Sequence, residues 1–338
     1  MNLNEIKYCP GTLTEGYNTY SRTCLRKVFG GKSVSHILPY NSPQTDEKDD
    51  EKFVENRKRI SISGVQEKMS IILDKNKLRL TREGEQGNYI LKPIPRDLKK
   101  VNQVPANEHL TMQIANQVYG IHTAENALIF FKDGKPAYIT KRFDVKEDPD
   151  SYRDKWGKED FASLAGKSEE NIGPNFKYDY SYEELAELLK KHVPAYLVEV
   201  EKLFSLLVFN YLFSNGDAHL KNFSLLESPN GDYLLSPAYD LINSRIHADD
   251  PMFGLDKGLF KDDFKSGSYK INGHPGKNDF IELAKRMEIQ EKRIEKLLAP
   301  FLVKQPKVEE LTRRSFLNVL TKKAYIIHYN ERRNYLNK

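Results

Sequence analysis

The chain has 338 residues and a mass of 39.2 kDa, which is enough for a sizeable core and for two lobes. It is 39% hydrophobic, 30% charged and 11% aromatic and carries a net charge of +5, which is the composition of an ordinary globular protein. The longest apolar run, 203–213, is about half of the roughly 20 residues that a membrane-spanning helix needs, and the N-terminus has no signal-peptide pattern, so we expect a cytoplasmic protein.

The N-terminal part of the chain gives few structural signals. Residues 1 to about 40 contain short aromatic and glycine-rich pieces without a long period, and residues 41–51 form a solvated, charged linker. Cys9 and Cys24 are too few for a disulfide framework, and a structural zinc site would need two further ligands, so we expect two reduced thiols. We assign residues 1–58 to an N-terminal segment and charged linker.

A β-rich lobe is predicted for residues 59–150. Strands are expected at 60–72, 77–81, 88–93, 127–131 and 136–143. The last two are joined through Asp133-Gly134, a hairpin signal. A helix is expected from Pro105 to Tyr119, because proline is tolerated in a first turn, where its missing N–H is harmless.

A helical lobe is predicted for residues 151–338. Helices are expected at 182–192, 195–213, 277–287, 290–301 and 311–330, with a β-hairpin set among them at 223–240. The sequence therefore predicts an α+β protein of two lobes, with a cleft between a β-rich N-lobe and a mainly helical C-lobe.

A loop dense in polar groups, 214–224, follows the apolar helix. Asp217 and Asn222 are five residues apart, the separation of base and metal ligand in the protein-kinase catalytic loop. Asp217 would accept a proton from an attacking hydroxyl, and His219 or Lys221 would face a transferring phosphoryl group. Taken alone, the Asp-Ala-His triplet is more typical of a surface turn with a capped helix end.

The hairpin brings a second acid to this loop. The Asn230-Gly231 turn lies midway between Asn222 and Asp240, so closing it returns Asp240 beside Asn222. An amide oxygen and a carboxylate side by side suit Mg²⁺, which takes phosphate oxygens as its remaining ligands. These groups together predict a phosphoryl-transfer site.

The β-rich lobe offers groups for ATP. Residues 61–68 lie between β-type segments and would turn backbone N–H groups toward phosphates. Lys92, at a strand end, would reach the α- and β-phosphates, and Glu108 on the next helix would pair with it. The backbone of 138–143 would bind adenine. The plain alternatives are a solvated strand end for Lys92 and a first-turn acid favoured by the helix dipole for Glu108.

The C-terminal tail is basic. From Leu311 to the end there are seven basic residues and one acid, Glu331. Such a tail is a candidate surface for phosphate backbones or an acidic protein. Because its apolar residues recur at helical spacing, the alternative is a packed terminal helix with a solvated basic face.

Four motifs resemble the HipA-like serine/threonine kinases, which are toxins of bacterial toxin–antitoxin systems. In the order of that family they are a Ser-x-x-Gly-x-Gln-Glu-Lys phosphate loop at 61–68, a nucleotide-lysine strand at 89–93, an Arg-Phe-Asp hinge at 141–144, and the catalytic and metal loops at 215–224 and 237–240. The last motif is the longest and the most specific.

The resemblance implies a protein-kinase-like fold that uses ATP and Mg²⁺. Asp217 would be the catalytic base, with His219 and Lys221 beside it, and Asn222 and Asp240 would be the metal ligands. Nucleotide-binding positions are implied at Ser63, Gly64, Val65, Gln66, Lys68, Lys92, Glu108, Lys141, Arg142, Phe143, Asp144, His219, Asn222, Tyr239 and Asp240.

The resemblance also implies regulation by autophosphorylation. The serine that opens the phosphate loop is modified in this family, and here it is Ser61. Ser63 shares its face of the strand, as in the short HipT-like branch, so either serine is a candidate. A phosphoserine brings about two negative charges to a loop that holds ATP phosphates, and repulsion should expel the loop and switch the enzyme off.

Two departures from the family shape the expected partners. Long members carry a β-rich N-terminal subdomain, whereas about 60 residues precede the phosphate loop here. We therefore expect a small antitoxin protein that docks on the N-lobe in its place, with a helix-turn-helix antitoxin as a further option. DNA would be reached only through the antitoxin, and no membrane is involved. Lys141 stands where relatives often have glutamate, which leaves its side-chain contacts open.

Two functions are weighed. The first is a kinase toxin that phosphorylates a cellular protein, with aminoacyl-tRNA synthetases as the substrate class that the family implies. The alternative is a nucleotide-binding component of a DNA-bound repressor complex without kinase turnover, which would act through the basic C-terminal face. A small-molecule kinase is a third, weaker option, since such enzymes share the spacing of Asp217 and Asn222.

Overall fold

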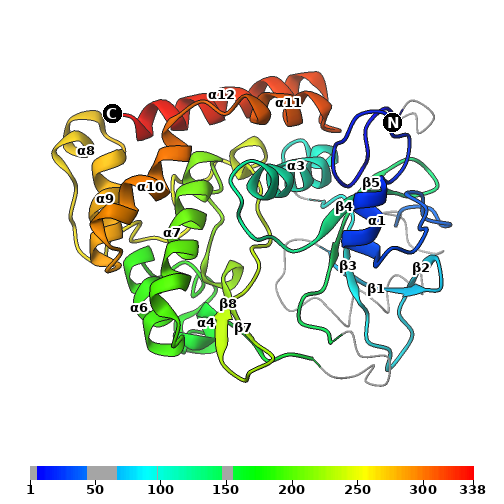
Figure 1. The fold of residues 1–338 in the computed structure, drawn as a ribbon, viewed down its shortest axis with the longest axis horizontal. Coiled ribbons are helices and arrows are strands. Elements are labelled where there is room, and N and C mark those ends of the chain that lie inside the picture. Colours follow the sequence, from blue (N-terminus) through cyan, green and yellow to red (C-terminus); the bar gives the residue numbers. More distant parts are fainter. Residues whose placement is uncertain (1–5, 44–66, 97, 147–154) are drawn as a thin grey trace. The chain divides into compact units, whose positions relative to one another are not determined.

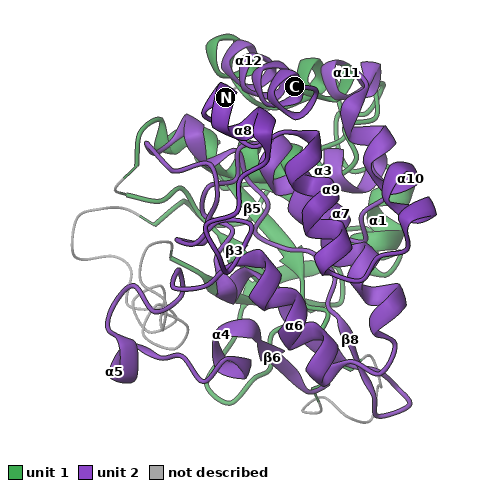
Figure 2. Cartoon of the chain, turned by 90° about the vertical axis from the view of Figure 1, so that its left-hand side faces the viewer, with its two compact units in different colours: residues 1–113, 124–155, 310–322 green, residues 114–123, 156–309, 323–338 purple. Residues whose placement is uncertain are grey.

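The computed structural model describes residues 6–43, 67–96, 98–146 and 155–338. The chain forms two compact units (Figure 2). Unit 1 comprises residues 1–113, 124–155 and 310–322, and unit 2 comprises residues 114–123, 156–309 and 323–338. The units are thus discontinuous in sequence, and the lobe boundaries at 58 and 150 stay a prediction.

Unit 1 contains a five-stranded sheet in the order β2-β1-β3-β5-β4 (Figure 1). The strands are β1 (Met69–Asp74), β2 (Lys77–Leu80), β3 (Tyr89–Lys92), β4 (Asn126–Phe130) and β5 (Pro136–Lys141). Each neighbouring pair is antiparallel. Strands β2 to β5 confirm the predicted ones to within two residues at each end. The prediction for 60–66 lies outside the described residues.

The described part of the N-terminal segment packs onto this sheet. Helix α1 (Arg22–Phe29) begins after Ser21, whose side chain accepts a hydrogen bond from the Cys24 amide, and it ends at Gly30 with φ 60°. Cys9, Cys24 and Phe29 are buried in one cluster with apolar residues of the sheet. Both cysteines are free thiols, as expected.

Helix α3 (Val104–Gln117) follows a short 3₁₀ turn, η2 (Val101–Gln103). It confirms the predicted helix, with Pro105 in its first turn. Its first ten residues belong to unit 1 and its last four to unit 2.

Unit 2 is mainly helical. In chain order it holds α4 (Phe161–Leu164), α5 (Glu169–Ile172), α6 (Tyr182–His192), α7 (Tyr196–Leu212), η3 (Leu220–Asn222), η4 (Ser244–Ile246), α8 (Gly267–Asn272), α9 (Lys277–Arg286) and α10 (Glu291–Leu302). The predicted α6, α7, α9 and α10 are confirmed to within one residue. Helix α7 is the most apolar, and Phe204, Val208 and Phe209 on it are fully buried.

The predicted hairpin is present in unit 2. Strands β7 (Ser224–Glu227) and β8 (Tyr233–Leu235) pair antiparallel, and Gly231 takes φ 81° in the turn between them, which glycine adopts without steric cost. Strand β6 (Lys158–Asp160), which the sequence did not predict, adds to the other side of β7. The polar loop 214–224 therefore leads directly into the middle strand of a small sheet.

The single helix predicted for 311–330 is wrong. The chain forms α11 (Pro306–Arg314) and α12 (Val319–Leu336). The Ser315 hydroxyl donates to the Thr312 carbonyl at 2.7 Å, and the Asn318 side chain accepts from the Thr321 amide at 2.8 Å, so the intervening residues close one helix and cap the next. None of the helices in the described part of the chain is long and apolar enough to cross a membrane.

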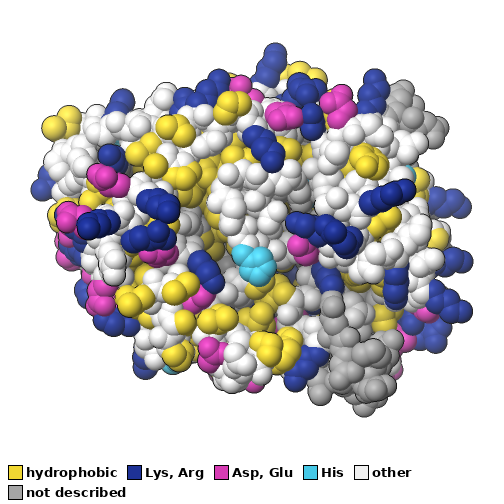
Figure 3. Space-filling model, in the orientation of Figure 1, with side chains coloured by type: hydrophobic (Ala, Val, Ile, Leu, Met, Phe, Trp, Pro, Cys, Tyr) yellow, Lys and Arg dark blue, Asp and Glu magenta, His cyan; other side chains and the backbone are white. Residues whose placement is uncertain are grey.

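Several bases of the C-terminal tail are engaged within the protein. Arg332 is 4% exposed; its Nε donates to the Ser214 hydroxyl at 3.3 Å, and its guanidinium lies 5.0 Å from the Tyr211 ring centre. Arg314 pairs with Glu15. Across the face in Figure 3, Lys and Arg side chains are spread out with Asp and Glu side chains among them. Not all basic side chains of the tail therefore belong to a solvated face, because Arg332 and Arg314 contact other residues of the protein.

Candidate active site

The polar loop predicted from the sequence is held rigidly in unit 2. At its start Ser214 has φ 53°, a left-handed conformation that is unusual for a residue with a side chain. The Asn215 side chain donates to the Asn210 side chain at 3.0 Å, and the Gly216 amide donates to the Ser244 hydroxyl at 2.9 Å. The end of α7 and the η4 turn thus fix the direction in which the loop leaves.

Glycines let a distant segment approach this loop closely. A Cβ on Gly254 would lie 2.4–2.7 Å from backbone atoms of Ala218, and one on Gly216 would lie 2.4 Å from the Pro251 carbonyl oxygen. Contacts this short are forbidden, so both positions require glycine for a steric reason. Residues 251–254 are therefore packed directly against the loop that carries Asp217.

Asp217 is the open acid of the loop. Its side chain is 52% exposed, and its Oδ1 accepts a hydrogen bond from the Tyr178 hydroxyl at 2.9 Å. Loss of solvation by the surrounding protein raises the pKa of Asp217, as do the charges of Asp250 and Asp240, while Lys177 and the Tyr178 hydrogen bond oppose the rise. A carboxylate with a raised pKa suits a general base.

His219 lies beside Asp217 as a neutral imidazole. Its Nε2 is 3.9 Å from Asp217 Oδ1, and its ring meets the Tyr178 ring edge-on at 5.3 Å. Burial, followed by the positive charge of Lys177, lowers the pKa of His219 to about 3. Lys221 lies over the Phe176 ring, with Nζ 5.8 Å from its centre.

Asn222 and Asp240 come together as predicted. Asn222 Nδ2 lies 3.4 Å from Asp240 Oδ2, and Asp240 has φ 56°, again left-handed. The expectation that the amide oxygen faces the carboxylate is wrong in this geometry, because Asn222 Oδ1 accepts from the His219 amide at 3.2 Å. That oxygen has a second lone pair, so one amide and one carboxylate still fit Mg²⁺, which binds to one or two protein groups plus phosphates.

Tyr239 links the polar loop 214–224 to the end of the hairpin. Its hydroxyl donates to the Lys221 carbonyl at 2.9 Å and is hydrogen-bonded to Ser224, while Lys158 Nζ lies 4.8 Å from the centre of its ring. The hydroxyl thus holds the residue before Asp240 against the residue before Asn222.

Unit 1 carries a buried ion pair. Lys92 at the end of β3 and Glu108 on α3 are 4% and 3% exposed, with Nζ 2.6 Å from Oε1. Lys92 Nζ also lies 5.4 Å from the centre of the Tyr138 ring. The predicted contact is confirmed. The alternative of a solvated strand end for Lys92 is wrong, and so is the first-turn acid for Glu108, because α3 begins at Val104 and has no acid in its first turn.

The expected hinge follows β5. Arg142 donates to both carboxylate oxygens of Asp144, at 3.0 and 2.5 Å, so Asp144 is held in a bidentate pair. The amides of Lys141 and Arg142 donate to Glu125 and Asn88 carbonyls at 2.8 Å. Both N–H groups are therefore already hydrogen-bonded within the protein. This leaves fewer of the backbone groups that the sequence predicted to bind adenine. Phe143 is partly buried.

The phosphate loop is only partly described. Ser61, Ser63, Gly64, Val65 and Gln66 lie outside the described residues, and Lys68 is partly buried just before β1. Glu67 Oε1 lies 3.2 Å from Arg96 Nη2, so the end of the loop contacts the segment that follows Lys92.

The sequence reasoning missed the residues that support Asp217. Tyr178 is 39 residues away in sequence, and Gly254 lies at a similar separation on the other side of the loop, so no local pattern could connect them to the loop. The one available signal was the alternation of tyrosines at 178, 180 and 182, which is typical of an extended segment that presents one face.

A model of the HipA-like C-terminal domain matches residues 60–309. The chain belongs to the HipA-like family. It is 26% identical to a Haemophilus influenzae protein named "Putative kinase", over 94% of this chain and 92% of that protein. It is also 26% identical to the Shewanella oneidensis serine/threonine-protein kinase toxin HipA, over 58% of this chain and 46% of that protein.

The fold agrees with that family. A chain of the Shewanella oneidensis toxin–antitoxin complex of HipA, HipB and operator DNA superposes with a TM-score of 0.61 at 19% identity, over 87% of this chain and 66% of that chain. The predicted α+β, two-lobed, kinase-like fold of the HipA type is thus confirmed. The family match spans the polar loop 214–224 and the hairpin.

Proposed function

We propose that this protein is an ATP- and Mg²⁺-dependent serine/threonine protein kinase that acts as the toxin of a HipA-type toxin–antitoxin system. The observation that carries the proposal is the convergence of Asp217, Asn222 and Asp240 on one loop and hairpin, with Asn222 and Asp240 3.4 Å apart. The names of the relatives, a kinase and a kinase toxin, support it.

Each group has one task in the proposed reaction. Asp217 accepts the proton of the acceptor hydroxyl as the oxygen of that hydroxyl attacks the γ-phosphorus, and the bond from this phosphorus to the β–γ bridging oxygen breaks so that ADP leaves. Asn222 and Asp240 would hold Mg²⁺, and the metal would supply positive charge to offset that of the phosphates. Lys92 neutralises the α- and β-phosphates, and Glu108 holds its ammonium group in place. Catalysis is then mainly positioning and electrostatic stabilisation.

The acceptors follow from the family resemblance. We propose a cellular protein, with an aminoacyl-tRNA synthetase as the first candidate, and autophosphorylation on Ser61 or Ser63. We also propose a small antitoxin that docks on the β-rich lobe, and a helix-turn-helix antitoxin as the link to DNA. The relative in the solved complex is bound to HipB and operator DNA, which supports an antitoxin partner.

The alternative of a repressor component without turnover depends on a basic C-terminal face. Arg332 is buried against Ser214 and Tyr211, and Arg314 is paired with Glu15 and Glu310. These contacts remove charge from the face that DNA would need, so the kinase remains the better-supported function.

Transfer of label from γ-labelled ATP tests the proposal. With Mg²⁺ and a cell extract, the full-length protein should label itself and an extract protein, and Asp217→Asn should lower transfer by at least about 100-fold. Asp263→Asn, an exposed acid in the same unit, is the matched control and should label as wild type does. Equal labelling by wild type and Asp217→Asn, or none by either, would contradict the proposal.

A further inference from the structure

The segment 177–183 is held between the catalytic loop and the segment that follows the hairpin. The Leu220 amide donates to the Lys177 carbonyl at 3.0 Å, and the Asp256 amide donates to the Tyr178 carbonyl at 2.9 Å. The Tyr182 amide donates to the Gly258 carbonyl at 3.0 Å. The segment therefore has backbone contacts on both sides, and its position relative to Asp217 is fixed.

Two of its three tyrosines reach the catalytic loop. The Tyr182 hydroxyl donates to the Ala218 carbonyl at 3.0 Å and accepts from the Gly254 amide at 3.2 Å. The Tyr178 hydroxyl donates to Asp217 Oδ1. Tyr180 instead lies beneath Lys167, whose Nζ is 5.4 Å from its ring centre. Tyr182 thus supports the backbone of the loop and Tyr178 contacts the side chain of Asp217, whereas Tyr180 lies against Lys167 and serves as a control position.

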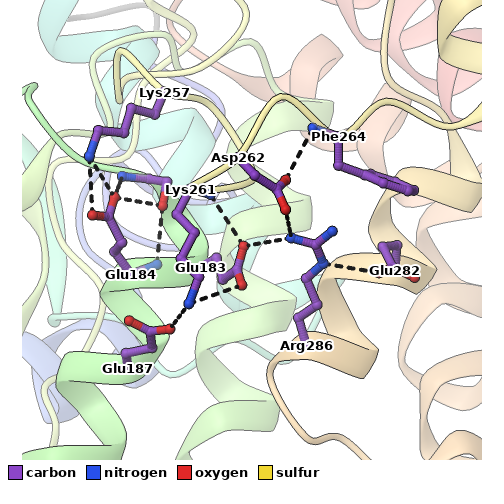
Figure 4. Close-up of polar contacts among 10 residues, drawn as sticks. Glu183, Glu184, Glu187, Lys257, Lys261, Asp262, Phe264, Glu282 and Arg286 are labelled. Atoms are coloured by element: carbon purple, nitrogen blue, oxygen red, sulfur yellow. Dashed lines mark hydrogen bonds and ion pairs between the residues drawn. The ribbon is translucent and has the colours of Figure 1, made fainter.

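An ion-pair network anchors the C-terminal end of this segment (Figure 4). Glu183 Oε2 accepts from Arg286 Nη1 at 3.0 Å and from the Lys261 amide at 3.2 Å. Glu184 Oε1 lies 3.1 Å from Lys257 Nζ. As the close-up shows, the acids of the first turn of α6 face the basic side chains of residues 257–261 and of α9. Single exposed pairs contribute little, but a network spanning three elements restricts where the segment can lie.

Tyr178 has the surroundings of a positioning group. Lys177 Nζ lies 4.9 Å from its ring centre, and the His219 ring contacts it edge-on. Its hydroxyl donates to Oδ1, one of the two carboxylate oxygens of Asp217. A donor whose own ring is held by such contacts restricts rotation of the carboxylate that it binds.

We propose that Tyr178 positions Asp217 for catalysis, by binding Oδ1 so that Oδ2 is turned to receive the proton of the acceptor hydroxyl. This inference rests on the proposed kinase function. Tyr178 does not touch the acceptor and is a positioning residue. Because Asp217 also faces Lys177, His219, Asp240 and Asp250, a carboxylate without the Tyr178 bond would turn toward Lys177 or away from the two acids.

Steady-state kinetics test the inference. The acceptor is a synthetic peptide copying residues 55–68, which contains Ser61 and Ser63, and the donor is γ-labelled ATP. Tyr178→Phe should lower kcat by at least about tenfold, the loss expected for a hydrogen bond to a charged group, with KM for ATP unchanged. Tyr180→Phe should leave both constants unchanged. A Tyr178→Phe enzyme with the wild-type kcat would overturn the inference.

A spectroscopic measurement separates this inference from the proposed function. With 3-fluorotyrosine placed at position 178 of the full chain, the ¹⁹F resonance should move when Asp217 is changed to Asn, whereas the same label at position 180 should not respond. This readout needs no turnover. Wild-type protein without transfer activity would contradict the kinase proposal. A ¹⁹F resonance at position 178 that does not shift in Asp217→Asn would overturn the role of Tyr178, whether or not the protein is a kinase.

Discussion

Lys92 and Asp217 are the two charged groups on which the proposed chemistry depends most, and they are held in opposite ways. Lys92 is 4% exposed and paired with a carboxylate that is 3% exposed. Asp217 is 52% exposed and is oriented by one tyrosine hydroxyl and by glycines that bring neighbouring backbone close. Lys92 in unit 1 is thus held in place by burial and an ion pair, whereas Asp217 in unit 2 is exposed and is held in place by contacts from neighbouring residues.

The contrast separates stability from activity. Removing one partner of a buried ion pair leaves an uncompensated charge inside the protein, which strongly destabilises it. Changing an exposed carboxylate usually alters stability little. Variants of unit 1 should therefore act on folding as well as on nucleotide binding, whereas variants around Asp217 should act mainly on turnover.

The largest expected effect on stability is at Glu108. Glu108→Ala should lower the free energy of unfolding by about 3–5 kcal/mol, because the buried Lys92 would lose its ion pair with Glu108. Asp217→Ala should change it by less than about 0.5 kcal/mol. Urea unfolding of the full chain measures both.

A double variant sharpens the first result. Lys92→Met with Glu108→Leu removes both charges and should recover most of the lost stability. Equal destabilisation by Glu108→Ala and Asp217→Ala would show that burial does not distinguish the two groups.

The next effect is at the close contact between Gly254 and Ala218. Gly254→Ala should destabilise by about 1–3 kcal/mol, since a methyl group there must displace backbone, and it should also lower turnover because Ala218 adjoins Asp217. Gly267→Ala is the matched control, because a Cβ at that position meets nothing within 4 Å. Melting temperatures and initial rates check this, and a neutral Gly254→Ala would refute the contact.

A further effect concerns the pH dependence of stability and His109 on α3. Burial lowers the pKa of His109 to about 4, while its Nε2 lies 3.0 Å from the Gly11 carbonyl. In the unfolded chain the His109 imidazole takes up a proton near pH 6.5, whereas in the folded chain it stays neutral down to about pH 4. The free energy of unfolding should therefore fall as pH drops from about 6.5 to about 4, by at most about 1.4 kcal/mol per pH unit. His109→Gln should remove this slope, and an unchanged pH dependence of unfolding would contradict it.

The sequence predicted the parts of the site that lie close together in the chain. Asp217, Asn222 and Asp240 span one loop and one hairpin, and a turn at Gly231 was enough to bring them together. Lys92 and Glu108 followed from a strand and the helix after it. These are short-range relations that spacing and turn chemistry specify.

What was missed depends on contacts across long stretches of chain. Tyr178 reaches Asp217, and Gly254 meets Ala218, only after the helices of unit 2 have packed. Helix α1 was not predicted because it is short, although the residues that cap it, Ser21 and Gly30, can be read in the sequence. The break between α11 and α12 was not predicted because the helical spacing of apolar residues continues across it. The side chain of Asn318, which caps α12, determines where the second helix begins.

Phosphopeptide mass spectrometry of the purified full-length protein, expressed once as wild type and once as Asp217→Asn, tests the central claim most directly. A kinase whose base is Asp217 should carry phosphate on Ser61 or Ser63 in the wild type and none in the variant. Phosphate at the same serine in both proteins, or in neither after incubation with ATP and Mg²⁺, would contradict it.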